Sequence, residues 1–267
     1  YPDRDAVALR ADLAAYLGRE SGVALAGDQL WAANGSNEIM HQLLLAFGGP
    51  GRTALGFTPT YSMYPEYCRD TFTRYVTAPR DDEFRVDAAT AVEAIGQHQP
   101  DVVLLASPNN PTGTPLSLDV VRAVLEAAPG MVVIDEAYAE FRRDGVPSAL
   151  ELVDANPHMI VTRTMSKAFG AAGLRLGYAA ASQEIVDQLT VVRLPYHLSA
   201  ITQAAARAAL SHRAPLRAQV AELRESRDQL AADLQGLGLR TVPSDANFVM
   251  FGTFEDRHAI WQGLLDR

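Results

Sequence analysis

The sequence holds a single cysteine among its 267 residues, Cys68, so no disulfide can form within the chain. Disulfides belong to oxidising compartments, and their absence fits a reducing one. No apolar run approaches the length of a membrane span, and the first residues lack the basic-then-apolar pattern of a secretion signal. We therefore expect a cytoplasmic protein. We interpret Cys68 as a packing residue, because no histidine stands near it in sequence.

An excess of positive charge is also missing. Lys and Arg number 23 against 32 Asp and Glu, which gives a formal net charge of −9. Electrostatics therefore favours neither nucleic acid nor an anionic membrane as a partner. The six histidines show no metal-ligand spacing, so we predict no metal site. No Gly-x-Gly-x-x-Gly turn is present, which argues against a dinucleotide-binding dehydrogenase.

The hydrophobic content of 48% and charged content of 21% are ordinary for a globular protein, and the chain is long enough to bury a full core. From residue 53 onward, strand-like apolar runs alternate with helical patterns. The expected strands are 54–57, 73–77, 102–106, 131–134, 159–162 and 176–180, and the expected helices are 61–70, 87–96, 117–127 and 182–193. This alternation predicts an α/β fold, a three-layer αβα domain with a mostly parallel sheet covered on both faces.

Two helices are expected before this alternation. The first spans 3–17 and ends at Gly18, and the second is capped by Ser36 or Asn34 and ends at Gly48.

After Pro195 the pattern changes. We expect a largely helical region with a break near Pro215, two short strands over 239–242 and 247–251, and a last helix near 255–266. The predicted organisation is an N-terminal segment over 1–30, a large domain over 31–198, a connecting helical region over 199–235, and the start of a smaller α+β domain over 236–267.

Four loops with polar residues follow expected strands, at the edge where open parallel sheets bind ligands. They are Pro59-Thr60-Tyr61, Ser107-Pro108-Asn109-Asn110-Pro111-Thr112-Gly113, Asp135-Glu136-Ala137-Tyr138 and Thr162-Arg163-Thr164-Met165-Ser166-Lys167-Ala168-Phe169-Gly170. Each alone has a structural interpretation: Asn-Pro-Thr-Gly is common turn chemistry, an acidic pair can cap a helix, and a tyrosine beside proline often packs. Their occurrence together, after these strands, favours a functional site.

Lys167 is the residue around which this site is organised. A lysine at the end of a buried strand is unusual, because burying an ammonium is costly unless its charge is removed or paired. One way to remove the charge is a Schiff base with an aldehyde cofactor. The alternative is an ordinary loop lysine in solvent. The other three loops, and Arg175 eight residues further on, favour the cofactor.

With these motifs the chain resembles the class I and II aminotransferases, which are pyridoxal-phosphate enzymes of fold type I. Within them the likeness is to the histidinol-phosphate aminotransferase group, through residues 33–38, 59–64, 163–169 and 194–199. The resemblance implies a homodimer that moves an amino group between histidinol phosphate and 2-oxoglutarate in histidine biosynthesis. The alternatives are an aromatic-amino-acid transaminase, a threonine-phosphate decarboxylase, and a non-catalytic cofactor-binding module, which would be expected to have lost Lys167 or Asp135.

The resemblance also implies roles for residues around the cofactor ring. Lys167 forms the Schiff base with pyridoxal 5′-phosphate and afterwards moves the proton between Cα and C4′. Asp135 faces the pyridine nitrogen and keeps it protonated. Asn110 and Tyr138 donate hydrogen bonds to the phenolate oxygen, and Tyr61 stacks on the ring.

For the cofactor phosphate, the resemblance implies backbone donors at a helix start and side-chain donors opposite them. The backbone donors are Gly35, Ser36 and Asn37, and the side-chain donors are Thr164, Ser166 and Arg175. Whether Tyr64, Tyr196, His197 and Asn247 line a substrate pocket stays open.

Members of the family carry an upstream arm that reaches the partner subunit and a late arginine that binds substrate. We find neither in these residues, which begin at Tyr1 and stop inside a helical pattern at Arg267. We therefore expect a part of a longer protein that binds the cofactor without efficient turnover on its own.

Overall fold

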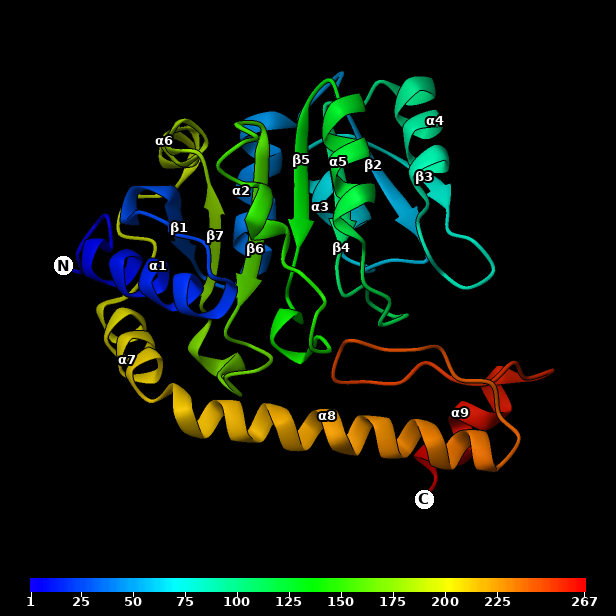
Figure 1. Ribbon diagram of the computed structural model, residues 1–267. Coiled ribbons are helices and arrows are strands. Elements are labelled where there is room, and N and C mark those ends of the chain that lie inside the picture. The colour runs from blue at the N-terminus through cyan, green and yellow to red at the C-terminus, as the bar shows by residue number, and fades with distance from the viewer.

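A seven-stranded sheet forms the centre of the structure, a computed structural model that describes residues 1–267 (Figure 1). The strands follow one another across the sheet in the order β1-β7-β6-β5-β4-β2-β3. Their bounds are β1 Leu30–Ala33, β2 Thr53–Thr58, β3 Arg74–Pro79, β4 Val102–Ala106, β5 Met131–Asp135, β6 Met159–Thr164 and β7 Gly177–Ala181. The six strands expected between residues 54 and 180 are present, with ends shifted by at most two residues.

The sheet is mostly parallel, as the alternating pattern predicts. β7 is the exception, since it pairs antiparallel with both β6 and β1. The pairs from β3 across to β6 are all parallel. The carboxyl ends of β2, β4, β5 and β6 therefore meet at one edge, where the four polar loops lie.

Strand β1 is a difference from the prediction. Its four residues are all buried, and Ala33 pairs with Gly177 of β7. The sequence predicts only the following helix, capped by Ser36 or Asn34, because a run of four residues carries no strand periodicity. The strand is defined by its distant partner instead.

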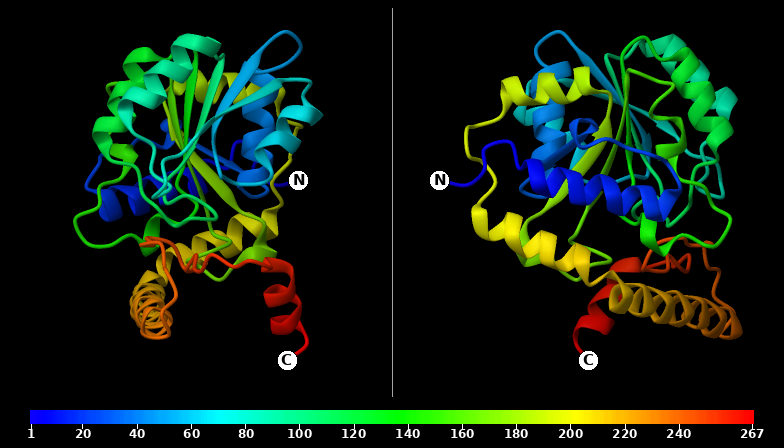
Figure 2. Two further views of the ribbon diagram at one scale, coloured as in Figure 1. Left: turned by 90° about the vertical axis from the view of Figure 1, so that its right-hand side faces the viewer. Right: turned by 60° about the vertical axis from the view of Figure 1, so that its left-hand side comes forward.

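Helices cover both faces of the sheet, which confirms the three-layer arrangement (Figure 2). One core packs between the sheet and α1 (Val7–Ser21), α4 (Ala88–His98), α5 (Leu118–Ala127) and α7 (Ala200–Ser211). The second core packs against α2 (Ser36–Phe47), α3 (Tyr64–Asp70) and α6 (Gln183–Val192). Short 3-10 helices lie at η1 (Gly27–Gln29), η2 (Ala139–Phe141), η3 (Ala149–Leu152) and η4 (Ala172–Leu174).

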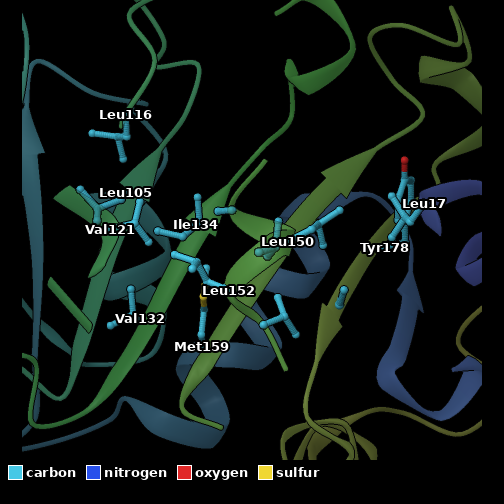
Figure 3. Close-up of a cluster of buried hydrophobic side chains, with 14 of the residues drawn as sticks. Leu17, Leu105, Leu116, Val121, Val132, Ile134, Leu150, Leu152, Met159 and Tyr178 are labelled. Atoms are coloured by element: carbon cyan, nitrogen blue, oxygen red, sulfur yellow. The ribbon is translucent and has the colours of Figure 1, made fainter. Parts of the chain in front are cut away.

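The two cores share the strands through the alternation of side chains along each strand. In β4, Val103 and Leu105 belong to the first core, whereas Leu104 and Ala106 belong to the second. Figure 3 shows part of the first core, with Leu105 and Ile134 on neighbouring strands. Burying a side chain of this size contributes about 1.5–3 kcal/mol, so a strand that is apolar on both faces supports both layers.

The first two helices differ from the prediction at their ends. α1 begins at Val7 and passes through Gly18 to Ser21, where Gly22 ends it in a left-handed conformation at φ 75°. Neither Ser36 nor Asn34 caps α2 with its side chain. Instead the carboxylate of Glu38 accepts hydrogen bonds from the Asn34 amide at 2.5 Å and from its Nδ2 at 2.9 Å.

The region after β7 is helical as expected. The break falls at His212, between α7 and α8 (Arg213–Gly236). Pro215 does not interrupt α8, because it is the third residue of that helix, where the backbone N–H has no intrahelical acceptor. The predicted strands over 239–242 and 247–251 are wrong. A single bridge joins Thr241 to Phe251, and two short strands with no sheet beside them are marginal.

Beyond that bridge the chain ends in α9 (Arg257–Leu265), which confirms the expected last helix. None of the helices, including the 24-residue α8, is long and apolar enough to cross a membrane.

Candidate active site

The four polar loops close around a single cavity of about 250 Å³ at the carboxyl edge of the sheet. All the predicted site residues except Gly35 line it: Ser36, Asn37, Tyr61, Asn110, Asp135, Tyr138, Thr164, Ser166, Lys167 and Arg175. They come from the start of α2, from the loops that follow β2, β4, β5 and β6, and, for Arg175, from the segment between η4 and β7. Segments far apart in the sequence therefore meet because parallel strands end together.

Asp135 is the last residue of β5, and its carboxylate is almost completely buried. Its Oδ2 accepts a hydrogen bond from the Tyr64 hydroxyl at 3.1 Å, and its Oδ1 accepts from the Ala137 amide at 3.2 Å and the Thr162 hydroxyl at 3.3 Å. Burial raises the pKa of Asp135 to about 6, while these three donors oppose the rise. Asp135 is therefore ionised at neutral pH although its side chain is buried in the wall of the cavity.

Lys167 lies on the turn that follows β6 and lines the same cavity. Its Nζ lies 5.3 Å from the centre of the Tyr138 ring. The turn is held by backbone hydrogen bonds from Met165 to the Leu176 carbonyl and from Gly170 to the Lys167 carbonyl. The amine is therefore presented to the cavity by an ordered turn.

Asn110 and Tyr138 lie side by side. The Asn110 Nδ2 donates to the Tyr138 hydroxyl oxygen at 3.2 Å, which leaves the phenolic hydrogen free to point at a third group. The neighbouring Asn109 is fully buried and fixes the loop, donating to the Pro59 carbonyl at 3.1 Å and to the Thr112 hydroxyl at 2.8 Å. Asn109 thus joins the loop of Asn110 to the loop of Tyr61.

The start of α2 offers two backbone donors to the cavity. The amides of Ser36 and Asn37 have no acceptor within the protein, as expected for the first residues of a helix without a side-chain cap. Gly35 differs from the prediction, because its amide donates to the Ala33 carbonyl at 2.8 Å. The contribution of Gly35 is its shape, since a Cβ added there would overlap the Arg175 guanidinium.

Three side chains face these amides. The Thr164 hydroxyl lies 3.0 Å from the Ser166 hydroxyl, and both line the cavity. Arg175 adopts a left-handed conformation at φ 55°, and its guanidinium reaches toward the α2 start. Two free amides, two hydroxyls and a guanidinium form a donor set suited to a phosphate dianion.

Tyr64 is the main functional side chain that sequence reasoning left unassigned. It does not line the cavity but is fully buried behind Asp135, with its ring edge-on to Tyr61 at 5.7 Å. Tyr196, His197 and Asn247 are also absent from the cavity wall. The position of Tyr64, three residues after the predicted ring-stacking tyrosine, was the only available signal.

Cys68 is fully buried, which confirms its interpretation as a packing residue. Burial raises the pKa of the Cys68 thiol to about 12, so it is not a nucleophile at neutral pH.

The sequence profile of the family described as aminotransferase class I and II matches residues 1–267. Histidinol-phosphate aminotransferase 3 of Burkholderia lata is 61% identical over 267 residues, which cover all of this chain and 72% of that protein. The histidinol-phosphate aminotransferase of Frankia casuarinae is 56% identical over 270 residues, which cover all of this chain and 68% of the relative.

Solved structures give the same result. The crystal structure of histidinol-phosphate aminotransferase from Sinorhizobium meliloti in complex with pyridoxal-5′-phosphate superposes with a TM-score of 0.89 at 27% identity, covering all of this chain and 71% of that one. Aspartate aminotransferase from Thermus thermophilus with maleate superposes with a TM-score of 0.84 at 27% identity, covering 97% of this chain and 71% of that one.

Proposed function

Because this chain belongs to the class I and II aminotransferase family, we propose that it transfers an amino group between histidinol phosphate and 2-oxoglutarate in histidine biosynthesis. It is an enzyme of the pyridoxal-phosphate-dependent class. The observation that carries the substrate proposal is the identity of 61% and 56%, over the whole chain, to relatives named histidinol-phosphate aminotransferase.

The residues of the cavity fit pyridoxal 5′-phosphate. The cavity is lined by a buried carboxylate, an amine, and two free backbone amides at the start of α2. Gly35 has φ +84°, which disfavours a side chain, and a Cβ there would displace the Arg175 guanidinium from its present position. We propose that Ser36, Asn37, Thr164, Ser166 and Arg175 hold the phosphate.

The cofactor, when bound, supplies an electron sink for the charge that develops as the substrate Cα–H bond breaks. In our proposal Asp135 accepts a hydrogen bond from the ring nitrogen and so keeps a proton on that atom. Asn110 and Tyr138 donate to the ring oxygen, and Tyr61 packs on the ring face. These side chains orient the ring and exclude water from it.

Lys167 has two tasks in the proposal. Its Nζ would hold the cofactor by a covalent bond to the aldehyde carbon. When free of that bond, the same Nζ would accept the proton from the substrate Cα and donate it to C4′, as a positioned general acid–base group. Its approach over the Tyr138 ring keeps Nζ close to the side chains that orient the cofactor.

The experiment that tests the function compares three amino donors. Purified protein loaded with the cofactor is assayed with histidinol phosphate, phenylalanine and threonine phosphate, with and without 2-oxoglutarate. Formation of glutamate from histidinol phosphate at a kcat/KM at least tenfold above that with phenylalanine supports the proposal. Release of CO₂ from threonine phosphate without 2-oxoglutarate, or a preference for phenylalanine, contradicts it and supports one of the alternatives.

We propose that the protein works as a homodimer in the cytoplasm. The dimer is supported by large apolar side chains left in solvent around the connection from α6 to α7, where Val191 is 77% exposed, Leu194 76% and Ile201 81%. The cytoplasm is supported by the single buried cysteine. The division into segments at residues 30, 198 and 235, with a cofactor-binding domain over 31–198, stays a prediction as well.

A further inference from the structure

A cluster of charged side chains lies buried at the end of β5 and β6, and the proposed mechanism does not use it. At its centre is Arg163 of β6, whose side chain is 1% exposed. The carboxylates of Glu20, Glu136 and Glu140 and the guanidinium of Arg142 surround it, with side-chain exposures of 17%, 2%, 7% and 9%. Burying five charged groups costs desolvation free energy, so we looked for a role of this cluster in the site.

The strongest contact in the cluster joins the two segments that carry the candidate active site. The Nε and Nη2 atoms of Arg163 donate to Oε2 of Glu136 at 3.0 and 2.7 Å. Glu136 is the neighbour of Asp135, and Arg163 precedes the Thr164–Lys167 turn. Glu136 is itself fixed, accepting from the Ser148 hydroxyl at 2.8 Å and from the Ala149 amide at 2.8 Å.

The backbone ladder between β5 and β6 stops at this point. The last register pair is Asp135 with Thr162, and the last backbone hydrogen bond runs from the Glu136 amide to the Thr162 carbonyl at 2.8 Å. Past these residues no backbone hydrogen bond joins the Asp135–Tyr138 loop to the lysine turn. Beyond the end of the ladder, the Glu136–Arg163 ion pair therefore connects the Asp135–Tyr138 loop to the strand that leads into the lysine turn.

The cluster and the cavity lie on opposite faces of the sheet. Asp135 and Thr164 line the cavity, whereas their neighbours Glu136 and Arg163 point to the other face. There the Nη1 atom of Arg163 donates to Oε2 of Glu20, on α1, at 2.9 Å. Helix α1 packs on that face, where Leu17 of α1 and Tyr178 of β7 belong to the same core cluster (Figure 3).

We propose that Arg163 is a positioning residue for this site: through Glu136 and Glu20 it holds the Asp135 loop and the Lys167 turn at a fixed separation, from the face behind the cofactor. The inference rests on the proposed function, because it assigns Arg163 a task only if Asp135 and Lys167 act on one bound molecule. Arginine suits this task, since its planar fork contacts several oxygens at once.

Electrostatics adds a signature that a merely structural ion pair would not have. The charge of Glu136 raises the pKa of Asp135, and Arg163 lies against that charge. Removing the Glu136 charge should lower the pKa of Asp135, and removing Arg163 should raise it. The other titratable groups that face Asp135 are left unchanged by these substitutions: Tyr64 from α3, and Tyr61, Tyr138, Lys167 and Arg175 around the cavity.

The test uses Glu136→Gln and Arg163→Met, with Arg207→Met as the matched control. Arg207 also ties α1 to another helix, through Asp12 at 2.6 Å, but it is 50% exposed and far in sequence from the site. For each protein three quantities are measured: the Kd for pyridoxal phosphate by absorbance titration between pH 5 and 8, kcat and KM for transamination, and thermal unfolding.

We expect both cluster variants to lose roughly 10- to 100-fold in kcat, with KM changed less than about threefold, because misplaced catalytic groups affect the reaction more than substrate binding. We also expect the pH midpoint of cofactor binding to move down in Glu136→Gln and up in Arg163→Met. The Arg207→Met control should match wild type.

Folded variants with wild-type cofactor Kd, kcat and pH midpoint would overturn the inference, as would shifts of both midpoints in the same direction. If Arg163→Met does not fold, Glu20→Gln replaces it, since that side chain is less buried; it should lower kcat in the same direction by a smaller factor, and a wild-type kcat in it would overturn the inference. A wild-type protein that binds no cofactor would instead refute the proposed function.

Discussion

The Tyr64 hydroxyl lies 3.1 Å from Oδ2 of Asp135, and both side chains are buried on the same side of the cavity. Burial also raises the pKa of Tyr64, so its hydroxyl remains a donor throughout the physiological range. An oriented neutral donor stabilises the ionised carboxylate without adding a charge to the site. The contact therefore determines the pH range over which Asp135 can hold a proton on a bound ring.

Replacing Tyr64 with Phe should raise the pKa of Asp135 from about 6 by about one to two units, because a hydrogen bond to a charged group contributes about 1.5–3 kcal/mol. The affinity of the apoprotein for the cofactor is measured by absorbance titration at a series of pH values. The pH at which binding is half lost on the acid side should rise by the same amount. Tyr178→Phe is the matched control, since Tyr178 is fully buried and its hydroxyl has no partner. An unmoved midpoint in Tyr64→Phe would exclude this role.

Asp135 should also make the apoprotein less stable as the pH rises. Its folded pKa of about 6 lies above the ordinary 3.8, so its contribution is fully present below pH 3.8 and is lost as the pH rises through 6. The free energy of unfolding of Asp135→Asn, relative to wild type, should therefore increase by up to about 3 kcal/mol between pH 4 and 8. Urea unfolding at both pH values measures this difference, and a constant difference would contradict it.

Lys167→Ala should abolish covalent attachment of the cofactor. Borohydride treatment of the loaded wild type, followed by peptide mass spectrometry, should locate the vitamer on residue 167, and the variant should carry none. We expect kcat to fall roughly 10²- to 10⁴-fold, since the same amine is the proposed acid–base group. Lys167 is the only lysine in the chain, so a label found instead at the N-terminal amine of the wild type would contradict this role.

Gly35→Ala should weaken binding of the phosphorylated cofactor selectively. An added Cβ would overlap the Arg175 guanidinium, and Gly35 has φ +84°, which disfavours any side chain. We expect the Kd for pyridoxal phosphate to rise at least roughly tenfold, whereas binding of pyridoxal, which has no phosphate, should change much less.

Gly49→Ala separates backbone strain from the steric effect. Gly49 has φ +115°, but nothing lies within 4 Å of a Cβ added there. This variant should lose stability of about 1 kcal/mol without a change in cofactor affinity. Equal losses of affinity in both glycine variants would show that the effect is not specific to Gly35.

Sequence patterns predicted the features that depend on local chemistry. The apolar runs predicted the strands from β2 to β7, and the polar residues directly after them predicted the cavity wall, because parallel strands bring their ends together. Arg175, to which the resemblance assigns a place at the cofactor phosphate, lines the same cavity.

Features that depend on distant partners were not predictable. β1 is recognisable only through its pairing with β7, and the contact of Tyr64 with Asp135 joins positions on different elements. Arg163 reads as one polar residue in a loop motif, yet it is the largest fully buried side chain, because four partners from three other segments converge on it. The prediction of strands over 239–242 and 247–251 was wrong for the opposite reason. The local pattern favours strands there, but no neighbouring sheet pairs with these residues.

The pairing of β1 with β7 has a consequence for the order of events during translation. Ala33 pairs with Gly177, and a Cβ on Gly177 would collide with the backbone of Gly35 and Ser36. The start of α2, where we propose that the phosphate binds, therefore packs directly against a strand that is synthesised much later. A nascent chain released before Ala181 lacks that support. We expect ribosome-arrested chains to retain the vitamer only when they extend past this residue, which would tie the acquisition of vitamin B6 to a late stage of synthesis.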